Sequence, residues 1–303
     1  MAIRPNLDMD VLRTFVTAFE LGSFARAADR LGRSQSAVST QLRKLEEQIG
    51  QALVQKSGRG LVLTAAGESL FSYAKRILEL NDEAVQMVRG AEVEGWVRLG
   101  LPQDFAESWL PAILARFART HPKVRVEVRA DRNVHLLEKL MKGELDLVLA
   151  WGAGDDAPHA AKVADLQLAW VGRPDWPGVR SLGAEPLPLV AFEQPCLFRS
   201  AGIAALDAAG IPWRLVFLSA SLSGLWAAAA AGLGITLRTA VGMPAGLSAL
   251  DPIATGLPAL PSISLALHRA DDEPNAAVSS LADILMETIH DQLGMLAKPR
   301  LAA

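Results

Sequence analysis

The chain has little cysteine and little histidine, and neither is arranged for a disulfide or a metal site. Its 303 residues include one cysteine, Cys196, and five scattered histidines. A single cysteine excludes a disulfide within the chain and is typical of proteins in a reducing cytosol. No His-x3-His or paired-cysteine spacing occurs. The sequence therefore predicts no metal, no cofactor and a cytoplasmic location.

The sequence also lacks the motifs of common enzyme classes. It contains no G-x-S-x-G, no P-loop and no G-x-G-x-x-G, which argues against a nucleophile elbow or a phosphate-binding turn. We therefore predict that the chain is not an enzyme and has no catalytic residues. A redox role for Cys196 is disfavoured, because thiol sensors often need a second, resolving cysteine.

Signals for export or for a membrane span are missing or interrupted. Residues 1–10 hold no apolar run before a small-residue cleavage site. Leu215 to Leu237 is uncharged and long enough to cross a bilayer, but serines break its first third and glycines its last. This pattern predicts a buried strand, a turn, a helix and a strand, and no membrane partner.

Negative charge dominates the chain as a whole but not its N-terminal part. The net charge is −3, yet residues 1–65 hold nine Lys/Arg and six Asp/Glu. The rest holds 21 Lys/Arg and 27 Asp/Glu, so the charge is +3 in the first part and −6 in the second. This asymmetry indicates that only the N-terminal part meets a polyanion.

Three short helical patterns occupy this basic part. Apolar residues at steps of three and four predict helices near 12–19, 24–31 and 35–49. Ser23 and Ser34 are the predicted N-caps of the second and third helices, and glycines suit their ends. The two short runs in "ALVQKSGRGLVLT" predict a hairpin after the third helix.

A short helix, a tight turn and a polar-faced second helix form a helix-turn-helix, whose second helix fits the DNA major groove. Glutamine can read adenine edges, serine and threonine accept several base edges, and arginine can neutralise phosphate. The hairpin would be a wing that touches the DNA backbone or the minor groove. A merely solvated polar face is the alternative. The predicted DNA-binding residues are Arg33, Gln35, Ser36, Ser39, Thr40, Arg43, Lys56 and Arg59.

Residues 66–94 show the pattern of one long helix. Its apolar residues recur at alternating steps of four and three, with the polar Asn81 inside the stripe. Such a stripe favours a helix that pairs with its copy, and a buried asparagine could set the register of that pairing. The alternative is a surface helix packed on its own domain.

The remaining sequence alternates strand and helix patterns. Strands are expected at 96–102, 124–130 and 145–151, each followed by helical or turn signals. The theme repeats from about residue 165 to a long C-terminal helix at about 275–293. This alternation predicts parallel α/β sheets in two lobes.

Residues 12–78 resemble the LysR-type bacterial transcription regulators. The landmarks are "GSFARAA", "SQSAVSTQLRKLEEQIG" and the wing "VQKSGRGLVLTAAG". The rest of the chain, from about residue 95 and called the body below, agrees with the family in layout. It has "VRLGLP", "ELDLVLAW" and "AAGLGITL" at the family's usual places. Within the family, "GLPQDFAESWLP" and "PCLFRSAG" favour an LrhA-like subgroup.

The resemblance implies a winged helix-turn-helix at 1–65, a linker dimerisation helix at 66–94 and an effector-binding domain at 95–303. The effector domain would be similar to periplasmic binding proteins, with lobe I at about 95–168 and 266–297 and lobe II at about 169–265. It implies double-stranded DNA and a small-molecule effector as partners, and a homodimer through the linker helix that joins into a homotetramer.

The resemblance also assigns roles to single residues. Gln35, Ser36 and Ser39 would face bases, whereas Thr40, Arg43, Arg59 and Thr64 would lie near phosphate or in the minor groove. Many relatives have proline at position 36 and arginine or glutamine at position 40. This chain has Ser36 and Thr40 at these positions instead. One potential charged contact is therefore lost, and the chain can recognise different bases.

The effector site is expected beyond the carboxyl ends of the body strands. Serines before a helix start could hold a carboxylate and Arg199 could pair with it, whereas Asp104 would repel an anion and favour a neutral, zwitterionic or partly aromatic ligand. The alternative is that Ser223 only caps its helix, Trp151 is core and Arg199 points to water. The predicted residues are Pro102, Gln103, Asp104 and Phe105 in a loop, Trp151 and Gly152 after a strand, and Phe198, Arg199, Ser200, Ser221, Leu222 and Ser223 before helix starts.

Two functions of other classes remain as alternatives. A solute-binding protein would fit the body alone but would need an export signal. An enzyme would need a catalytic constellation that the sequence does not show.

Overall fold

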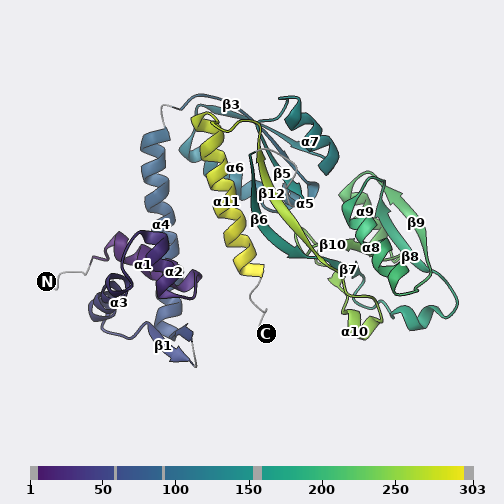
Figure 1. Ribbon diagram of the computed structural model, residues 1–303, viewed down its shortest axis with the longest axis horizontal. Coiled ribbons are helices and arrows are strands. Elements are labelled where there is room, and N and C mark those ends of the chain that lie inside the picture. The colour runs from purple at the N-terminus through teal and green to yellow at the C-terminus, as the bar shows by residue number, and fades with distance from the viewer. Residues whose placement is uncertain (1–5, 58–59, 91–92, 153–158, 297–303) are drawn as a thin grey trace. The chain divides into compact units, whose positions relative to one another are not determined.

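The computed structural model describes residues 6–57, 60–90, 93–152 and 159–296, and the chain divides into two compact units, residues 1–90 and 91–303. Figure 1 labels most of their helices and strands. Each unit has a hydrophobic core of its own.

The first unit is a bundle of helices with a two-stranded hairpin. All three predicted short helices, the hairpin and the long helix are confirmed, and the long helix ends at Gly90. The elements are α1 (Met9–Glu20), α2 (Phe24–Leu31), α3 (Gln35–Ile49), β1 (Val54–Ser57), β2 (Gly60–Leu63) and α4 (Ala65–Gly90).

Short side chains fix the start of α2 and α3, as predicted. The Ser23 hydroxyl accepts the backbone N–H of Arg26 at 3.4 Å, and the Ser34 hydroxyl accepts that of Ala37 at 3.2 Å. These bonds satisfy amides that have no partner within the helix. Gly32 ends α2 at φ 61°, a left-handed conformation that glycine adopts without steric cost, so α3 can begin only three residues later.

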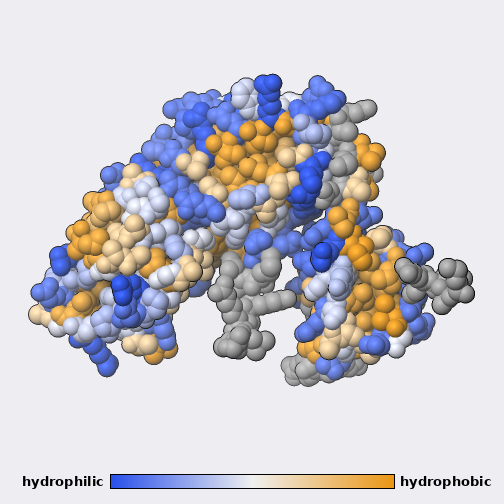
Figure 2. All heavy atoms as spheres, turned by 180° about the vertical axis from the view of Figure 1, so that it is seen from behind, coloured by the Kyte–Doolittle hydropathy of each residue, from blue (hydrophilic) through white to orange (hydrophobic). Residues whose placement is uncertain are grey.

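The first half of α4 belongs to the core of its own unit. Ala74 and Leu78 are buried against residues of α1 such as Phe15. For this half the alternative interpretation of the apolar stripe is therefore correct, and Asn81 donates its amide to the neighbouring Asp82 at 3.0 Å. Further along the helix, Leu80 and Val88 are 66% and 80% exposed, and Figure 2 shows hydrophobic side chains at the surface of this unit among hydrophilic ones.

The first lobe of the second unit is built on a five-stranded mixed sheet in the order β4-β3-β5-β12-β6 (Figure 1). Strands β3, β4 and β5 run parallel, whereas β12 pairs antiparallel with both β5 and β6. The prediction of a parallel sheet holds for β3, β4 and β5 but is wrong for β12, which returns from the second lobe in the opposite direction. The strands are β3 (Gly95–Leu101), β4 (Val124–Ala130), β5 (Leu147–Trp151), β6 (Ala160–Gln167) and β12 (Ser262–Arg269), and the helices are α5 (Gln103–Ser108), α6 (Leu110–Thr120), α7 (Asn133–Met141) and α11 (Ala276–Leu296).

Both faces of this sheet are covered. On β5, Leu147 and Leu149 join the cluster that contains residues of α6 and α11, whereas Val148 and Ala150 join the cluster of α7. A strand buried on both faces has to be apolar at every position, which is why "LVLAW" shows no alternation.

The second lobe contains a parallel pair, β8-β9, and an antiparallel trio, β10-β7-β11. A single bridge between Leu189 and Ile235 connects β8 with the segment that leads into β10. The pattern that begins to repeat near residue 165 opens with the apolar run "LQLAWVG" at 166–172, which forms the end of β6 and the whole of β7, with Leu168 between them. The elements are β7 (Ala169–Gly172), the 3-10 helix η1 (Val179–Leu182), β8 (Leu187–Phe192), α8 (Leu197–Ala208), β9 (Trp213–Ser219), α9 (Leu222–Ala230), β10 (Thr236–Arg238), β11 (Ser248–Ala249) and α10 (Pro252–Thr255).

The uncharged stretch from Leu215 to Leu237 forms most of β9, then α9 and the start of β10. The predicted order of strand, turn, helix and strand is therefore confirmed. None of the helices among the described residues combines the length and the apolar character that a membrane span requires.

A buried histidine makes the stability of the second unit sensitive to pH. His268 on β12 is 2% exposed, and burial lowers its pKa. Because the unfolded chain protonates this ring near pH 6.5, the stabilisation is complete above about pH 6.5 and is lost as the pH falls towards the lower pKa of the folded state. We expect the urea midpoint of this unit to fall between about pH 7.5 and about pH 5.5.

The control for this prediction is His268→Gln, which cannot titrate in this range. Its urea midpoint should fall less steeply over the same interval, although His121, whose pKa burial also lowers, still contributes. Identical pH profiles for the two proteins would show that His268 is not the group responsible.

Candidate DNA interface and effector site

Helix α3 presents a polar flank opposite its buried side. Val38, Leu42 and Leu45 are buried in the core of the first unit, whereas Gln35, Ser36, Thr40 and Arg43 are exposed and Ser39 is half-buried. The helix therefore has the two-sided character that the sequence predicts, with its amide, hydroxyl and guanidinium groups directed away from the core.

The hydroxyls on this flank are already engaged within the helix. Ser39 Oγ donates to the carbonyl of Gln35 at 3.1 Å, and Thr40 Oγ1 donates to that of Ser36 at 2.9 Å. In this arrangement the two hydroxyls offer lone pairs, which suit donors such as the amino groups of adenine and cytosine. Gln35 offers both an amide donor and a carbonyl acceptor.

Two predicted DNA-binding residues also hold the first unit together. Arg33 Nη2 lies 2.9 Å from Asp10 Oδ2, so its charge is shared with a carboxylate in the absence of DNA. Thr64 is the residue before α4: its hydroxyl donates to the carbonyl of Ala52 at 2.7 Å and accepts the N–H of Gly67 at 3.0 Å. Lys56 lies on β1, but its side chain is outside the described residues, as is Arg59.

The predicted loop after β3 is the short helix α5, and its Asp104 is paired. Asp104 forms two hydrogen bonds with the guanidinium of Arg238, one of them from Nε at 3.1 Å. Both side chains are buried, at 1% and 3% exposure. The guanidinium also lies 4.1 Å from the ring centre of Phe198 and 5.1 Å from that of Phe192. The expectation that Asp104 would repel an anion is therefore corrected, because Arg238 balances its charge.

Gln103 connects α5 to the start of α9. Its side-chain oxygen accepts the backbone N–H of Leu222 at 2.5 Å. Together with the pair of Asp104 and Arg238, this bond ties the end of β3 in the first lobe to two elements of the second. Pro102, buried directly before α5, accepts the N–H groups of Phe105 and Ala106 with its carbonyl.

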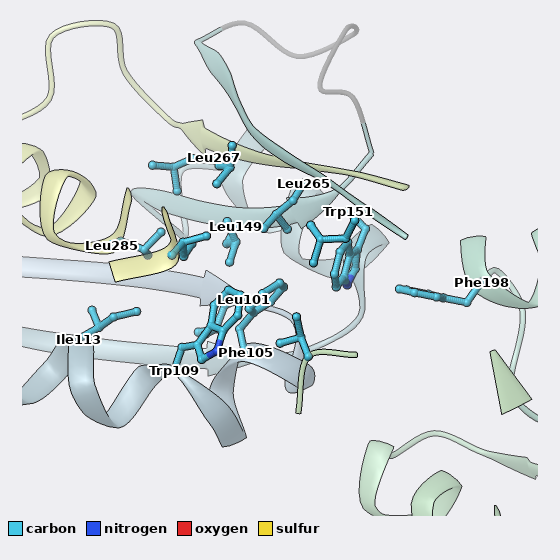
Figure 3. Close-up of a cluster of buried hydrophobic side chains, with 14 of the residues drawn as sticks. Leu101, Phe105, Trp109, Ile113, Leu149, Trp151, Phe198, Leu265, Leu267 and Leu285 are labelled. Atoms are coloured by element: carbon cyan, nitrogen blue, oxygen red, sulfur yellow. The ribbon is translucent and has the colours of Figure 1, made fainter. Parts of the chain in front are cut away.

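Phe105 and Trp151 form an aromatic core at the same edge of the sheet. Phe105 is buried with ring centres 4.8 Å from Trp109 and 5.1 Å from Trp151. Trp151 meets Phe198 edge-on at 5.3 Å, and Figure 3 shows Phe198, from α8, pointing toward it. Trp151 is 5% exposed and belongs to the hydrophobic core of this unit, which spans both lobes. Gly152 follows with φ 120°.

Of the residues predicted to precede helix starts, Ser221 does so, and the others lie within the helices. Phe198, Arg199 and Ser200 are in the first turn of α8, whose N-cap is Cys196. Ser221, not Ser223, caps α9, accepting the N–H of Gly224 at 3.2 Å, while Leu222 and Ser223 belong to its first turn. The serines are therefore exposed at a helix start, but one of them is already used by the helix.

Sequence reasoning missed Arg238 and Asn133. Asn133 holds the end of β5 with two bonds to the backbone of Trp151, at 2.6 and 2.7 Å. A charged residue at the end of the apolar run "GITLR" was the available signal for Arg238. For Asn133 no motif distinguishes it from an ordinary helix cap.

Both units match models of a known family. Residues 9–68 match "Bacterial regulatory helix-turn-helix protein, lysR family", and residues 90–289 match "LysR substrate binding domain". The second match alone covers more than half of the chain.

Two transcriptional regulators are similar to this chain over most of its length. The HTH-type transcriptional regulator PecT of Dickeya dadantii (strain 3937) is 37% identical over 279 residues, covering 91% of this chain and 86% of the relative. The HTH-type transcriptional regulator DgdR of Burkholderia cepacia is 36% identical over 280 residues, covering 92% and 93%.

The fold matches a solved full-length protein as well. The crystal structure of full-length BenM is 23% identical, covers 97% of this chain and 100% of that chain, and superposes with a TM-score of 0.51, which supports the fold alone. The LrhA-like subgroup stays a prediction. From the two family matches and these relatives, the chain belongs to the LysR family of DNA-binding transcriptional regulators, not to an enzyme family, and carries an effector-binding domain after its helix-turn-helix.

Proposed function

We propose that this regulator reads its operator with the N-terminal half of α3. The supporting observation is the exposed polar flank of that helix opposite Val38 and Leu42. Gln35, Ser36 and Ser39 meet base edges in the major groove, where the donor and acceptor pattern of each base pair is unique. Arg33, Thr40, Arg43, Lys56, Arg59 and Thr64 lie near phosphate or in the minor groove.

The protein works as a dimer in which two such DNA-binding units are joined through α4. The exposed apolar side chains of Leu80 and Val88 lie beyond the part of α4 that the core uses, and pairing would remove them from water. Two dimers join into a tetramer through the effector domains. We place the protein in the cytoplasm, where its DNA target is.

The effector binds between the two lobes and shifts an equilibrium between two arrangements of the protein. The contacts that support this site join the two lobes: Gln103 accepts the N–H of Leu222, and Trp151 meets Phe198. The proposed residues lie in or beside α5, β5, α8 and α9. They are Pro102, Gln103, Asp104, Phe105, Trp151, Gly152, Phe198, Arg199, Ser200, Ser221, Leu222 and Ser223.

DNase footprinting on the promoter beside the gene tests the proposed reading. We expect two protected half-sites with dyad symmetry. Arg43→Ala should weaken binding to all sequences and reduce the slope of log K against log salt by about 1 for each subunit bound. Gln35→Ala should instead relax base preference, by about 1–3 kcal/mol at one base pair.

Arg76→Ala is the matched control, because it removes the same charge from an exposed position on α4. It should leave both the salt slope and the base preference unchanged. A footprint unaffected by Arg43→Ala and Gln35→Ala would show that α3 is not the reading helix, and a single protected half-site would contradict pairing.

A further inference from the structure

A small cavity lies inside the second lobe, between α8 and the strands β8 and β10. Its lining includes Phe192, Cys196, Phe198, Arg199, Thr236 and Arg238, together with aliphatic side chains. The space open to the centre of a water molecule is about 20 Å³, enough for about one water.

The charges at this cavity are not balanced. Two arginines line it, and no carboxylate is among its lining residues in the part of the chain that the structure describes. Arg238 is balanced from outside the cavity by Asp104. Arg199 forms no ion pair with any described residue: Nη1 donates to the carbonyl of Phe192 at 3.4 Å, and the buried Nε has no partner among them.

A buried donor without a partner destabilises the folded protein, and more so where the group is charged. Proteins resolve such a site with a bound water or an ion. A water would satisfy the buried Nε–H, and the rest of the half-buried Arg199 guanidinium can be hydrated. A carboxylate satisfies the Nε–H and also balances the charge, since its two oxygens match the fork of a guanidinium.

We propose that this cavity binds the carboxylate of a small apolar acid, with Arg199 as the partner of the anion. This inference rests on the proposed effector site, which shares Phe198 and Arg199 with the cavity, and it adds a pocket for the anionic group of the ligand inside the second lobe. The rings of Phe192 and Phe198 pack against the apolar part. Asp104 keeps Arg238 in place, so the ligand displaces no charge of the protein.

Binding in this cavity is also expected to change the contact between the two lobes. The cavity holds about one water, so an acid enters only if α8 moves outward. Phe198 of α8 contacts Trp151 of the first lobe at 5.3 Å between ring centres (Figure 3). A shift of α8 therefore changes the contact between the lobes, which is the step that an effector has to produce.

The sole cysteine provides a direct measurement, because Cys196 lines the cavity. We use butyrate as the probe and butyramide as its neutral match, at constant ionic strength. A ligand of this size binds weakly, with a Kd on the order of millimolar. Butyrate should slow the reaction of the Cys196 thiol with Ellman's reagent and raise the melting temperature, and butyramide should do neither. Equal effects of the two compounds, or none from butyrate at about 50 mM, would overturn the proposal.

Variants of Arg199 complete the test. Arg199→Gln should weaken butyrate protection of Cys196 by at least about tenfold, and Arg199→Lys should weaken it less because the charge remains. Arg214→Gln, which removes an exposed charge of the same lobe outside the cavity, should respond like the unaltered protein. If Arg199→Gln does not fold, the comparison of Arg199→Lys with Arg214→Gln still tests the role of Arg199. If butyrate protected Cys196 equally in these two variants, the role of Arg199 would be overturned.

Footprinting without ligand separates this proposal from the proposed function. A protein that protects its operator but does not respond to butyrate would disprove the anion site alone. A protein that responds to butyrate without protecting any dyad would support the anion site and disprove the reading of DNA by α3.

Discussion

Replacing Asp104 with alanine is expected to lower the free energy of unfolding of the second unit by about 3–5 kcal/mol. The carboxylate and the guanidinium of Arg238 are both almost fully buried and are joined by two hydrogen bonds. Without Asp104, a cation stays in a site that water does not reach, and the rings of Phe192 and Phe198 compensate only part of that cost. Urea unfolding followed by tryptophan fluorescence measures the loss.

Removing both charges tests whether the cost comes from the orphaned cation. In Asp104→Leu combined with Arg238→Met, no charge is left buried, and such replacements of a whole pair are often neutral or stabilising. We expect the double variant to recover most of the stability that Asp104→Ala loses.

Asp175→Ala is the matched control, because Asp175 pairs with Arg173 in the same unit but at the surface. Exposed pairs contribute little, since water and salt screen them, so its unfolding curve should remain close to that of the unaltered protein. If Asp104→Ala and Asp175→Ala were equally mild, burial would not be what makes the first pair important.

This pair also marks the limit of what the sequence could predict about the effector site. Asp104 and Arg238 are 134 positions apart, and no local pattern connects them. From the sequence alone, Asp104 is expected to be an unpaired negative charge. This expectation favours a neutral, zwitterionic or partly aromatic ligand over an anion. With Arg238 beside it, Arg199 becomes the unbalanced charge, and an anionic ligand is favoured.

Elements defined by local chemistry were predictable. The limits of α3 follow from the side chain of Ser34 at one end and the left-handed Gly50 at the other, and both signals lie within a few residues of what they determine. Helix α5 was not predictable in the same way, because its six residues are too few to show a helical repeat. The predicted position of Phe198 and Arg199 before a helix start was also wrong, because α8 already begins at Leu197.

The apolar stripe of α4 shows another limit. A helix that packs on its own core and a helix that pairs with a copy require the same spacing of apolar residues. Only the folded first unit separates the two uses, because it buries Ala74 and Leu78 and leaves Leu80 and Val88 exposed. The strand directions in the first lobe are a similar case, since β12 comes from a distant part of the chain.

Gly67→Ala is expected to disrupt the first unit, although its effect on helix propensity alone is favourable. Alanine is more stable than glycine in a helix interior by about 1 kcal/mol, and Gly67 lies in the first turn of α4. A Cβ atom at this position would lie 2.0 Å from the carbonyl oxygen of Leu53 and 3.0 Å from Cδ2 of Leu63. That oxygen also accepts the N–H of Thr64 at 3.0 Å, so it cannot move without loss of the bond that holds Thr64, the residue before α4.

We therefore expect Gly67→Ala to destabilise the first unit by about 3 kcal/mol, at the upper end of what overpacking usually costs. Because the wing and α4 meet at this point, the operator footprint should be lost, while butyrate should still protect Cys196 in the second unit. Gly246→Ala is the control, since a Cβ there has no neighbour within 4 Å, and it should leave both readouts unchanged. A Gly67→Ala protein with normal unfolding and a normal footprint would show that the contact between α4 and Leu53 yields without cost.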